Sequence, residues 1–219
     1  MSRNEYKLMI APFHHNGFRS LSKKQAEEYF HWYVGQSKER IEQLYEYAQS
    51  TGGAAFLCEY TLDSLIELWN WFETQIDMVA KSEEEYQAEL KQFPEWMHDS
   101  ISKKRFSVRT LAIITDISFY FAETFIKHNS MVRWGYFTKP KNEVSVNMPV
   151  LLGFRSNMKL DPRRIVSVCA SESSEQHDKN RLRSAYRTWT KYTAETTPNI
   201  ADTFSSIRSE KYENDNWRG

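Results

Sequence analysis

Two acidic residues, Asp116 and Glu123, interrupt the most hydrophobic segment of the sequence, which we predict to form a helix over residues 108–128. Because they are seven residues apart, a helix places both carboxylates on one face, two turns from each other. Burying a carboxylate alone is costly, so each one needs a cation, a hydrogen-bond donor or solvent. One hypothesis is therefore an enzyme with an acidic site here, beside the lysines of the segment that follows.

The structural alternative assigns the same two acids to the scaffold. Glu123 would then cap or pair with the hairpin that follows, for example through Arg133 or backbone amide groups. Structural ion pairs also place acidic residues in apolar helices, so such residues do not by themselves indicate catalysis. We favour this alternative, and we expect that the protein is not an enzyme.

The segment after this helix, residues 134–154 (WGYFTKPKNEVSVNMPVLLGF), is predicted to contain strands. Its aromatic start favours a strand, and the Pro and Asn of KPKN, residues 139–142, favour a turn. From residue 144 to 148 apolar and polar residues alternate, which is typical of a half-buried strand. We predict a small antiparallel sheet that packs on the hydrophobic helix, because an isolated hairpin is marginal in water. The candidates for contact with a partner are Trp134, Tyr136, Lys139 and Lys141.

A basic stripe marks the C-terminal helix that we predict over residues 179–193. Arg183, Arg187 and Lys191 are spaced by four, and Trp189 belongs to the aromatic and apolar face of the same helix. Basic residues interleaved with aromatics can bind nucleic acid or nucleotides through phosphate contacts and stacking. We favour a docked helix with a solvated basic face, because 29 basic and 29 acidic side chains give a formal net charge of +0 and no general attraction for nucleic acid.

The remaining reactive residues form no recognisable catalytic or metal-binding motif. The six histidines are scattered, and the adjacent pair at residues 14 and 15 would point to opposite faces of an extended chain. The glycines at 52 and 53 lack the lysine and the spacing of a phosphate-binding loop. Cys58 and Cys169 lie far apart and are expected to be small core residues of a reduced protein. We therefore predict neither a metal nor a cofactor.

The composition favours a soluble protein with an aromatic core. Of the 219 residues, 40% are hydrophobic and 15% are aromatic, and large aromatic side chains dominate burial. The N-terminus has only a short apolar run that contains Glu5, which is not the pattern of a signal peptide. The longest apolar run, residues 111–121, is broken by Thr115 and Asp116 and is too short to span a bilayer. We expect a cytoplasmic protein with no membrane contact.

Helix signals recur along the chain and define the predicted fold. Ser22 and Ser82 each precede a Gln or Glu by three residues, which is the pattern of a capping box. The predicted fold is α+β and mainly α, with a helical core and one small antiparallel sheet around residues 134–154. Because the composition becomes polar after residue 170, we predict a helical α+β domain over residues 1–170. Residues 171–219 would form a polar linker, the basic amphipathic helix and a mobile C-terminal tail.

Four stretches in chain order, YFAETF, RWGYFTKP, VNMPVLLGF and LDPRRIV, resemble a group of small uncharacterised cytosolic proteins of Gram-positive bacteria and their mobile elements. The resemblance covers residues 116–168, and residues 30–44 more loosely, whereas the chain after Ser171 lies outside it. A similar helix-plus-hairpin module occurs in proteins proposed to confer immunity in bacterial toxin systems. No catalytic motif comes with this resemblance, which is one of fold alone.

Three functional hypotheses follow. The first is a non-enzymatic protein that binds and blocks a protein partner, of the immunity or antitoxin type. The second is nucleic-acid or nucleotide binding through the basic C-terminal helix. The third is an enzyme that uses Asp116 or Glu123.

Overall fold

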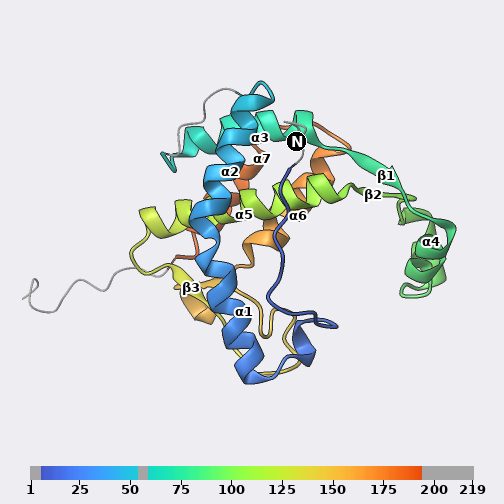
Figure 1. Cartoon of the computed structure of the whole chain (residues 1–219), viewed down its shortest axis with the longest axis horizontal. Coiled ribbons are helices and arrows are strands. Elements are labelled where there is room, and N and C mark those ends of the chain that lie inside the picture. The colour runs from blue at the N-terminus through green and yellow to red at the C-terminus, as the bar shows by residue number, and fades with distance from the viewer. Residues whose placement is uncertain (1–5, 54–58, 194–219) are drawn as a thin grey trace, which may run out of the picture.

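The central element of the fold is α5 (Val108–His128), and its predicted bounds are confirmed. The computed structural model describes residues 6–53 and 59–193, and α5 crosses the middle of this part of the chain (Figure 1). Ser107 begins the helix, because its hydroxyl oxygen accepts a hydrogen bond from the Thr110 amide at 3.2 Å. This bond satisfies one of the N–H groups that the first turn leaves free.

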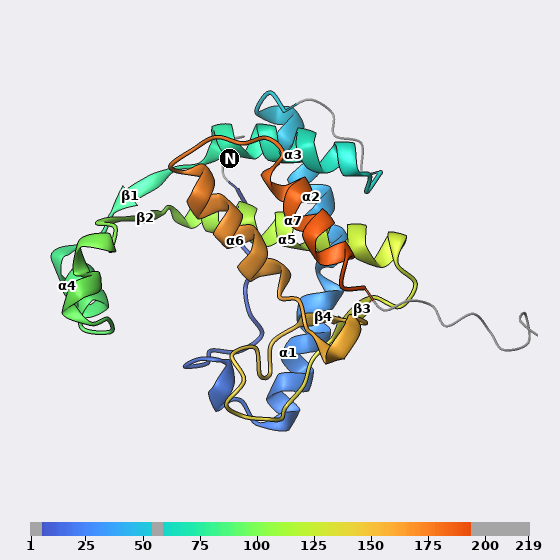
Figure 2. The ribbon, with the colours of Figure 1, turned by 180° about the vertical axis from the view of Figure 1, so that it is seen from behind.

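Helices dominate the rest of the described chain, which confirms the α+β, mainly α fold class. The helices α1, α2 and α3, which precede α5 in the chain, and α6 and α7, which follow it, are labelled in Figures 1 and 2. The bounds in chain order are η1 (Phe18–Ser20), α1 (Lys23–Gly35), α2 (Ser37–Ser50), α3 (Leu62–Gln75), β1 (Met78–Ala80), α4 (Glu83–Leu90), η2 (Glu95–Ser100), β2 (Lys104–Phe106), α5, β3 (Arg133–Gly135), β4 (Val150–Leu152), η3 (Arg155–Asn157), α6 (Pro162–Ser173) and α7 (Arg181–Thr190).

Helices from both halves of the chain cover α5, which packs against α2, α6 and α7. Aromatic contacts connect α5 to α1 and α7: the ring centroids of Tyr33 and Phe119 are 4.5 Å apart, and those of Phe125 and Tyr186 are 4.2 Å apart. Burial of each large apolar side chain stabilises the fold by about 1.5–3 kcal/mol. The core therefore forms around the C-terminal two thirds of α5, where residues 116–122 are all buried.

Both predicted capping boxes are confirmed. The Ser22 hydroxyl accepts from the Gln25 amide while the Gln25 side chain accepts from the Ser22 amide, and this pair begins α1. Ser82 and Glu85 make the same reciprocal bonds at the start of α4. Each box satisfies two N–H groups that a helix N-terminus otherwise leaves free.

The predicted sheet after α5 is present as β3 and β4, which pair antiparallel with Trp134 opposite Leu151. Leu151 also exchanges backbone hydrogen bonds with Leu160, at 2.7 and 3.1 Å. Gly153 follows β4 with a φ of +103°, and a Cβ atom there would lie 2.0 Å from the Met131 carbonyl oxygen. Only glycine fits such a close approach at positive φ.

The strand predicted from the alternation of residues 144–148 is wrong, because residues 141–147 form turns. Asn147 connects these turns to other segments: its amide donates to the Phe137 carbonyl at 2.8 Å, and its side chain donates to the Phe18 carbonyl at 2.9 Å. Val146 is buried and Val144 is 63% exposed. The polar Asn147 is buried as well, so the alternation corresponds neither to an extended backbone nor to the pattern of burial.

A second two-stranded sheet, which we did not predict, forms the stem of an arm. We define the arm as residues 78–106, in which β1 and β2 pair antiparallel and enclose α4 and η2. The arm extends away from the helices that surround α5 (Figures 1 and 2). No residue of the arm is buried.

The segment after α6 returns to the core. α6 ends at Ser173, whose hydroxyl donates to the buried Glu73 carboxylate on α3 at 2.6 Å. The Asp178 amide donates to the same carboxylate at 2.9 Å, and α7 then packs against α3. The division predicted at residues 170 and 171 falls inside α6. The tail after residue 193 lies outside the described residues, as does Cys58.

None of the helices within residues 6–53 and 59–193 combines the length and the hydrophobicity that crossing a bilayer requires.

Candidate functional site

The carboxylate of Asp116 is fully buried against α2, where Arg40 binds it with two hydrogen bonds. Arg40 Nε donates to Oδ1 at 2.8 Å, and Nη2 donates to Oδ2 at 2.7 Å. The hydroxyl of Tyr6, on the N-terminal segment, also donates to Oδ2. A planar guanidinium that binds both oxygens of a carboxylate is a strong and directional ion pair. The contact joins α5, α2 and the N-terminal segment.

Burial raises the pKa values of both Asp116 and Tyr6. It raises the pKa of the Asp116 carboxyl from 3.8 to about 6, although the hydrogen bonds and the charge of Arg40 act in the opposite direction. Burial, together with the adjacent Asp116, also raises the pKa of the Tyr6 hydroxyl well above its ordinary value of 10. Both directions follow from the cost of charge in apolar surroundings.

Glu123, like Asp116, faces α2, but its hydrogen-bond partners differ from those of Asp116. Its Oε1 accepts from the Ser37 hydroxyl at 3.1 Å and from the Trp134 indole nitrogen at 3.1 Å. The predicted contact with the hairpin is therefore present, although Trp134 supplies it and not Arg133. Asp116 and Glu123 both face α2, but each is engaged by its own structural donors. Both carboxylates therefore accept hydrogen bonds that connect α5 to neighbouring segments.

The four predicted partner-binding residues divide into two pairs. Trp134 is half-buried and packs edge-on against Tyr33, with ring centroids 5.9 Å apart. Tyr136 is also half-buried, and its ring lies 4.9 Å from that of Phe30. Lys139 and Lys141 are exposed in the turn. The aromatic pair therefore attaches the hairpin to α1 and α5, and only the lysines face solvent.

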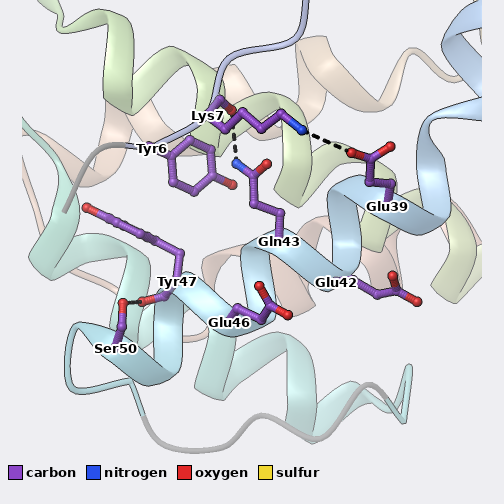
Figure 3. Close-up of a pocket in the computed structure, with 8 residues that line it drawn as sticks. All are labelled: Tyr6, Lys7, Glu39, Glu42, Gln43, Glu46, Tyr47 and Ser50. Carbon is purple, nitrogen blue, oxygen red and sulfur yellow. Dashed lines mark hydrogen bonds and ion pairs between the residues drawn. The ribbon is translucent and has the colours of Figure 1, made fainter. Parts of the chain in front are cut away.

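A hollow of about 490 Å³ lies between the N-terminal segment and α2 (Figure 3). The Lys7 ammonium binds the Glu39 carboxylate at 3.3 Å, and the Gln43 amide donates to the Lys7 carbonyl at 2.9 Å. Glu42 and Glu46 line the hollow from successive turns of α2 (Figure 3). Three glutamates of α2 line it, so the hollow is an acidic face of the helix.

The N-terminal half of α5 has an uncovered apolar side, which we call the α5 face and define by Val108, Leu111, Ala112 and Thr115. Val108 is 56% exposed and Leu111 is 47% exposed. Two hollows meet along this face, because Leu111 and Thr115 line both.

The two hollows differ in their walls. The smaller, of about 240 Å³, is closed by residues of the N-terminal segment and by the Arg40–Asp116 pair. The larger hollow, of about 610 Å³, has a wall opposite the α5 face. Val144 and Met148 of the turn segment and Arg163 and Arg164 of α6 form this wall. An apolar floor with a few polar groups at its edge is typical of a surface that binds another molecule.

Arg163 lies in the wall of the larger hollow, with its Nε atom 3.8 Å from the Asp161 carboxylate. Its guanidinium lies 5.3 Å from the Phe18 ring centroid and 5.1 Å from that of Tyr33, which favours a cation. Its Nε and Nη2 atoms are buried and have no hydrogen-bond partner among the described residues. Arg164 is exposed beside it. The Asp161 carboxylate accepts from the amides of both arginines as the N-cap of α6.

Of the basic residues predicted for nucleic-acid binding, Arg183 and Arg187 lie on α7, and Lys191 is its C-cap. Arg187 and Lys191 are exposed, and Arg183 Nη2 donates to the Asn180 side chain at 2.8 Å. The ring of Trp189 packs edge-on against that of Phe154, with centroids 5.5 Å apart. The helix is docked through its apolar side, and Trp189 is half-buried in that contact, which limits its use as a stacking platform.

Within the described ranges, no group of three or more His, Cys, Asp or Glu side chains is arranged to hold a metal ion. Cys169 is buried against the core, and burial raises the pKa of its thiol to about 11. A protonated, buried thiol is a poor nucleophile.

The sequence did not indicate two features of this region. Arg40 shares the α2 stripe of Ser37 and Leu44, all buried, and an arginine in such a stripe was the available signal for the partner of Asp116. The sequence contained no signal for the exposed α5 face, because a helix as hydrophobic as residues 108–128 is usually buried. Comparison of the chain with protein families, with curated proteins and with solved structures found no match to any of them.

Proposed function

We propose that this chain is a non-enzymatic binding protein that blocks a protein partner, of the immunity or antitoxin type, and that the partner docks on the α5 face. The observation that carries the proposal is the exposure of Val108 and Leu111 on a helix that is otherwise the core of the fold. Exposed apolar side chains that line connected hollows are typical of interaction sites.

The contacts of Asp116 and Glu123 support a binding role over a catalytic one. Asp116 is engaged by Arg40 and Tyr6, and Glu123 is engaged by Ser37 and Trp134. A general acid or base must reach the proton that it transfers. These carboxylates instead hold α2, α5 and the hairpin in place, and so make the α5 face a preformed surface.

The test is affinity capture of a partner from a lysate of the source organism with the whole chain, compared with a Val108→Asp variant. Val108 is the first residue of α5, where an acidic residue is favourable for the helix, so the variant should fold normally. We expect a stoichiometric protein to be retained by the wild-type chain and lost from the variant. Reconstitution of the purified pair should then give a complex that the same substitution weakens at least roughly tenfold.

Val168→Asp is the matched control. Val168 is 50% exposed, close to the 56% of Val108, but it lies on α6 in a different hollow. The control should retain the partner at the wild-type level. Equal retention by the Val108→Asp variant, or a chain that elutes without any stoichiometric protein, would refute the proposal.

A further inference from the structure

The arm exposes aromatic side chains that the fold does not use. Trp96, in η2, is 80% exposed, and Phe93 is 40% exposed. Neither α4 nor η2 contains a buried residue. Removing a large aromatic ring from water is strongly favourable, so an arm that presents two such rings is suited to contact a second surface.

The tip of the arm is also acidic. Residues 82–100 contain six acidic side chains and a single basic one, Lys91. Two of the acids are paired with the stem: Glu89 with Lys81, and Glu85 with Arg105 at 3.4 Å. The unpaired acids leave the tip with both aromatic area and negative charge.

The α5 face has the opposite properties. Its floor is apolar, and its α6 wall carries Arg163 and Arg164. Asp161 also lines this hollow, where it caps α6 and lies 3.8 Å from Arg163 Nε, and Asp116 binds Arg40. The exposed positive charge of the wall is therefore that of Arg164. An acidic, aromatic tip and a basic, apolar hollow are complementary in charge and in polarity.

We infer that the arm of one copy of this chain docks on the α5 face of a second copy. Each copy carries one arm and one face. With two-fold symmetry both arms pair with both faces and the assembly closes as a dimer, whereas without it the same contact would form a ring or a filament. Residues 78–106 are comparable with the roughly 20–30 residues that each partner contributes to a standard interface. The inference goes beyond the proposed function and concerns the same α5 face, so an external partner that docks there must displace the arm.

The test is the oligomeric state of the whole chain, measured by sedimentation velocity across a wide concentration range. We expect a dimer that dissociates on dilution. Trp96→Ala and Val108→Asp should each raise its dissociation constant at least roughly tenfold, as expected for anchor residues, whereas Val168→Asp should not change it. Urea unfolding of each variant establishes that the monomers are folded; Trp96 is so exposed that its loss should not alter stability.

A charge exchange tests the orientation of the contact. Arg164→Glu should weaken the dimer, and combining it with Glu83→Lys and Glu84→Lys should restore part of the affinity. Recovery requires that the arm tip of one copy lies near α6 of the other. A dimer that Arg164→Glu leaves unchanged would contradict this arrangement.

Other outcomes overturn the inference in distinguishable ways. A monomer at every concentration refutes the dimer but leaves the proposed function to the partner-capture experiment. If Val108→Asp weakens the dimer but Trp96→Ala does not, a segment other than the arm occupies the α5 face, and the inference is wrong. A dimer lost from a chain that ends at Thr193 assigns that role to residues 194–219. Failure of partner capture with a dimer intact refutes the external partner alone.

Discussion

Arg40 on α2 binds both carboxylate oxygens of Asp116 on α5, at 2.8 and 2.7 Å, and both side chains are buried. The same guanidinium donates to the Lys7 carbonyl at 2.9 Å. Arg40 therefore links the central helix to α2 and to the N-terminal segment at one point. This contact also forms one wall of the smaller hollow on the α5 face.

Breaking the pair from one side should strongly destabilise the fold. Arg40→Met leaves a buried carboxylate without its cation, and we expect the free energy of unfolding to fall by about 3–5 kcal/mol. Asp116→Leu leaves the guanidinium unpaired and should cost a similar amount. The double variant should be less destabilised than the sum of the two, because it buries no unpaired charge. Urea unfolding of the four proteins in a double-mutant cycle measures this coupling.

The control for this cycle is an exposed ion pair on the same helix. Lys38 and Glu42 are 3.9 Å apart and largely exposed. Lys38→Ala should change stability by less than about 0.5 kcal/mol, since exposed pairs contribute little. Additive effects of Arg40→Met and Asp116→Leu would contradict a coupled buried pair.

The raised pKa of Asp116 predicts a defined pH dependence. The pKa is about 6 in the folded protein against 3.8 ordinarily, so the folded state holds this proton more tightly than the unfolded chain. The stability that this proton contributes is complete below about pH 4 and is lost as the pH rises through about 6. The free energy of unfolding of the wild type, minus that of Asp116→Asn, should therefore decrease over this window by roughly 1–3 kcal/mol.

Urea midpoints measured between pH 4 and pH 7.5 for both proteins provide this difference. Taking the difference removes the titration of the other carboxyl groups, which both proteins share. A difference that increases with pH would show that the Arg40 charge, and not burial, determines the pKa of Asp116.

Glu123 is expected to support the hairpin through its acceptor oxygen. Glu123→Ala leaves the Trp134 indole and the Ser37 hydroxyl without their acceptor, and should cost about 1–3 kcal/mol. Glu123→Gln keeps an acceptor oxygen and should cost clearly less. The Trp134 indole N–H resonance in an NMR spectrum should shift in the alanine variant and stay near its wild-type position in the glutamine variant. Equal effects of the two substitutions would argue against this hydrogen bond.

The sequence predicted the features that local chemistry determines. The bounds of α5, both capping boxes and the sheet near residues 134–154 follow from periodicity, side-chain capping and β propensity. The strand predicted at Val144 to Met148 was wrong because Asn147 makes tertiary hydrogen bonds to Phe137 and Phe18. A single sequence contains no signal for such long-range bonds, and they replaced the extended backbone by turns.

The candidate site was less predictable for the same reason. The sequence indicated Asp116 and Glu123 because acidic residues are rare in an apolar helix. It did not indicate their partners, which lie more than 70 positions away or in a hairpin whose packing was unknown. Exposure of the α5 face depends on which helices cover α5, and the arm depends on the pairing of β1 with β2. Both are properties of the tertiary arrangement.

Gly153 should be among the least replaceable residues of the fold. A Cβ atom there would lie 2.0 Å from the Met131 carbonyl oxygen, and its φ is +103°. Gly153→Ala should therefore combine backbone strain of about 1–3 kcal/mol with a clash that forces β4 away from the end of α5.

Two other glycines separate the effect of backbone strain from that of the clash: at Gly52 φ is +81° with open space around a Cβ atom, and Gly35 has open space at negative φ. Gly52→Ala should cost about 1 kcal/mol, and Gly35→Ala should stabilise by about 0.5–1 kcal/mol. Thermal or urea unfolding of the three variants should give this order, and a Gly153→Ala protein as stable as Gly52→Ala would show that the hairpin can move without cost.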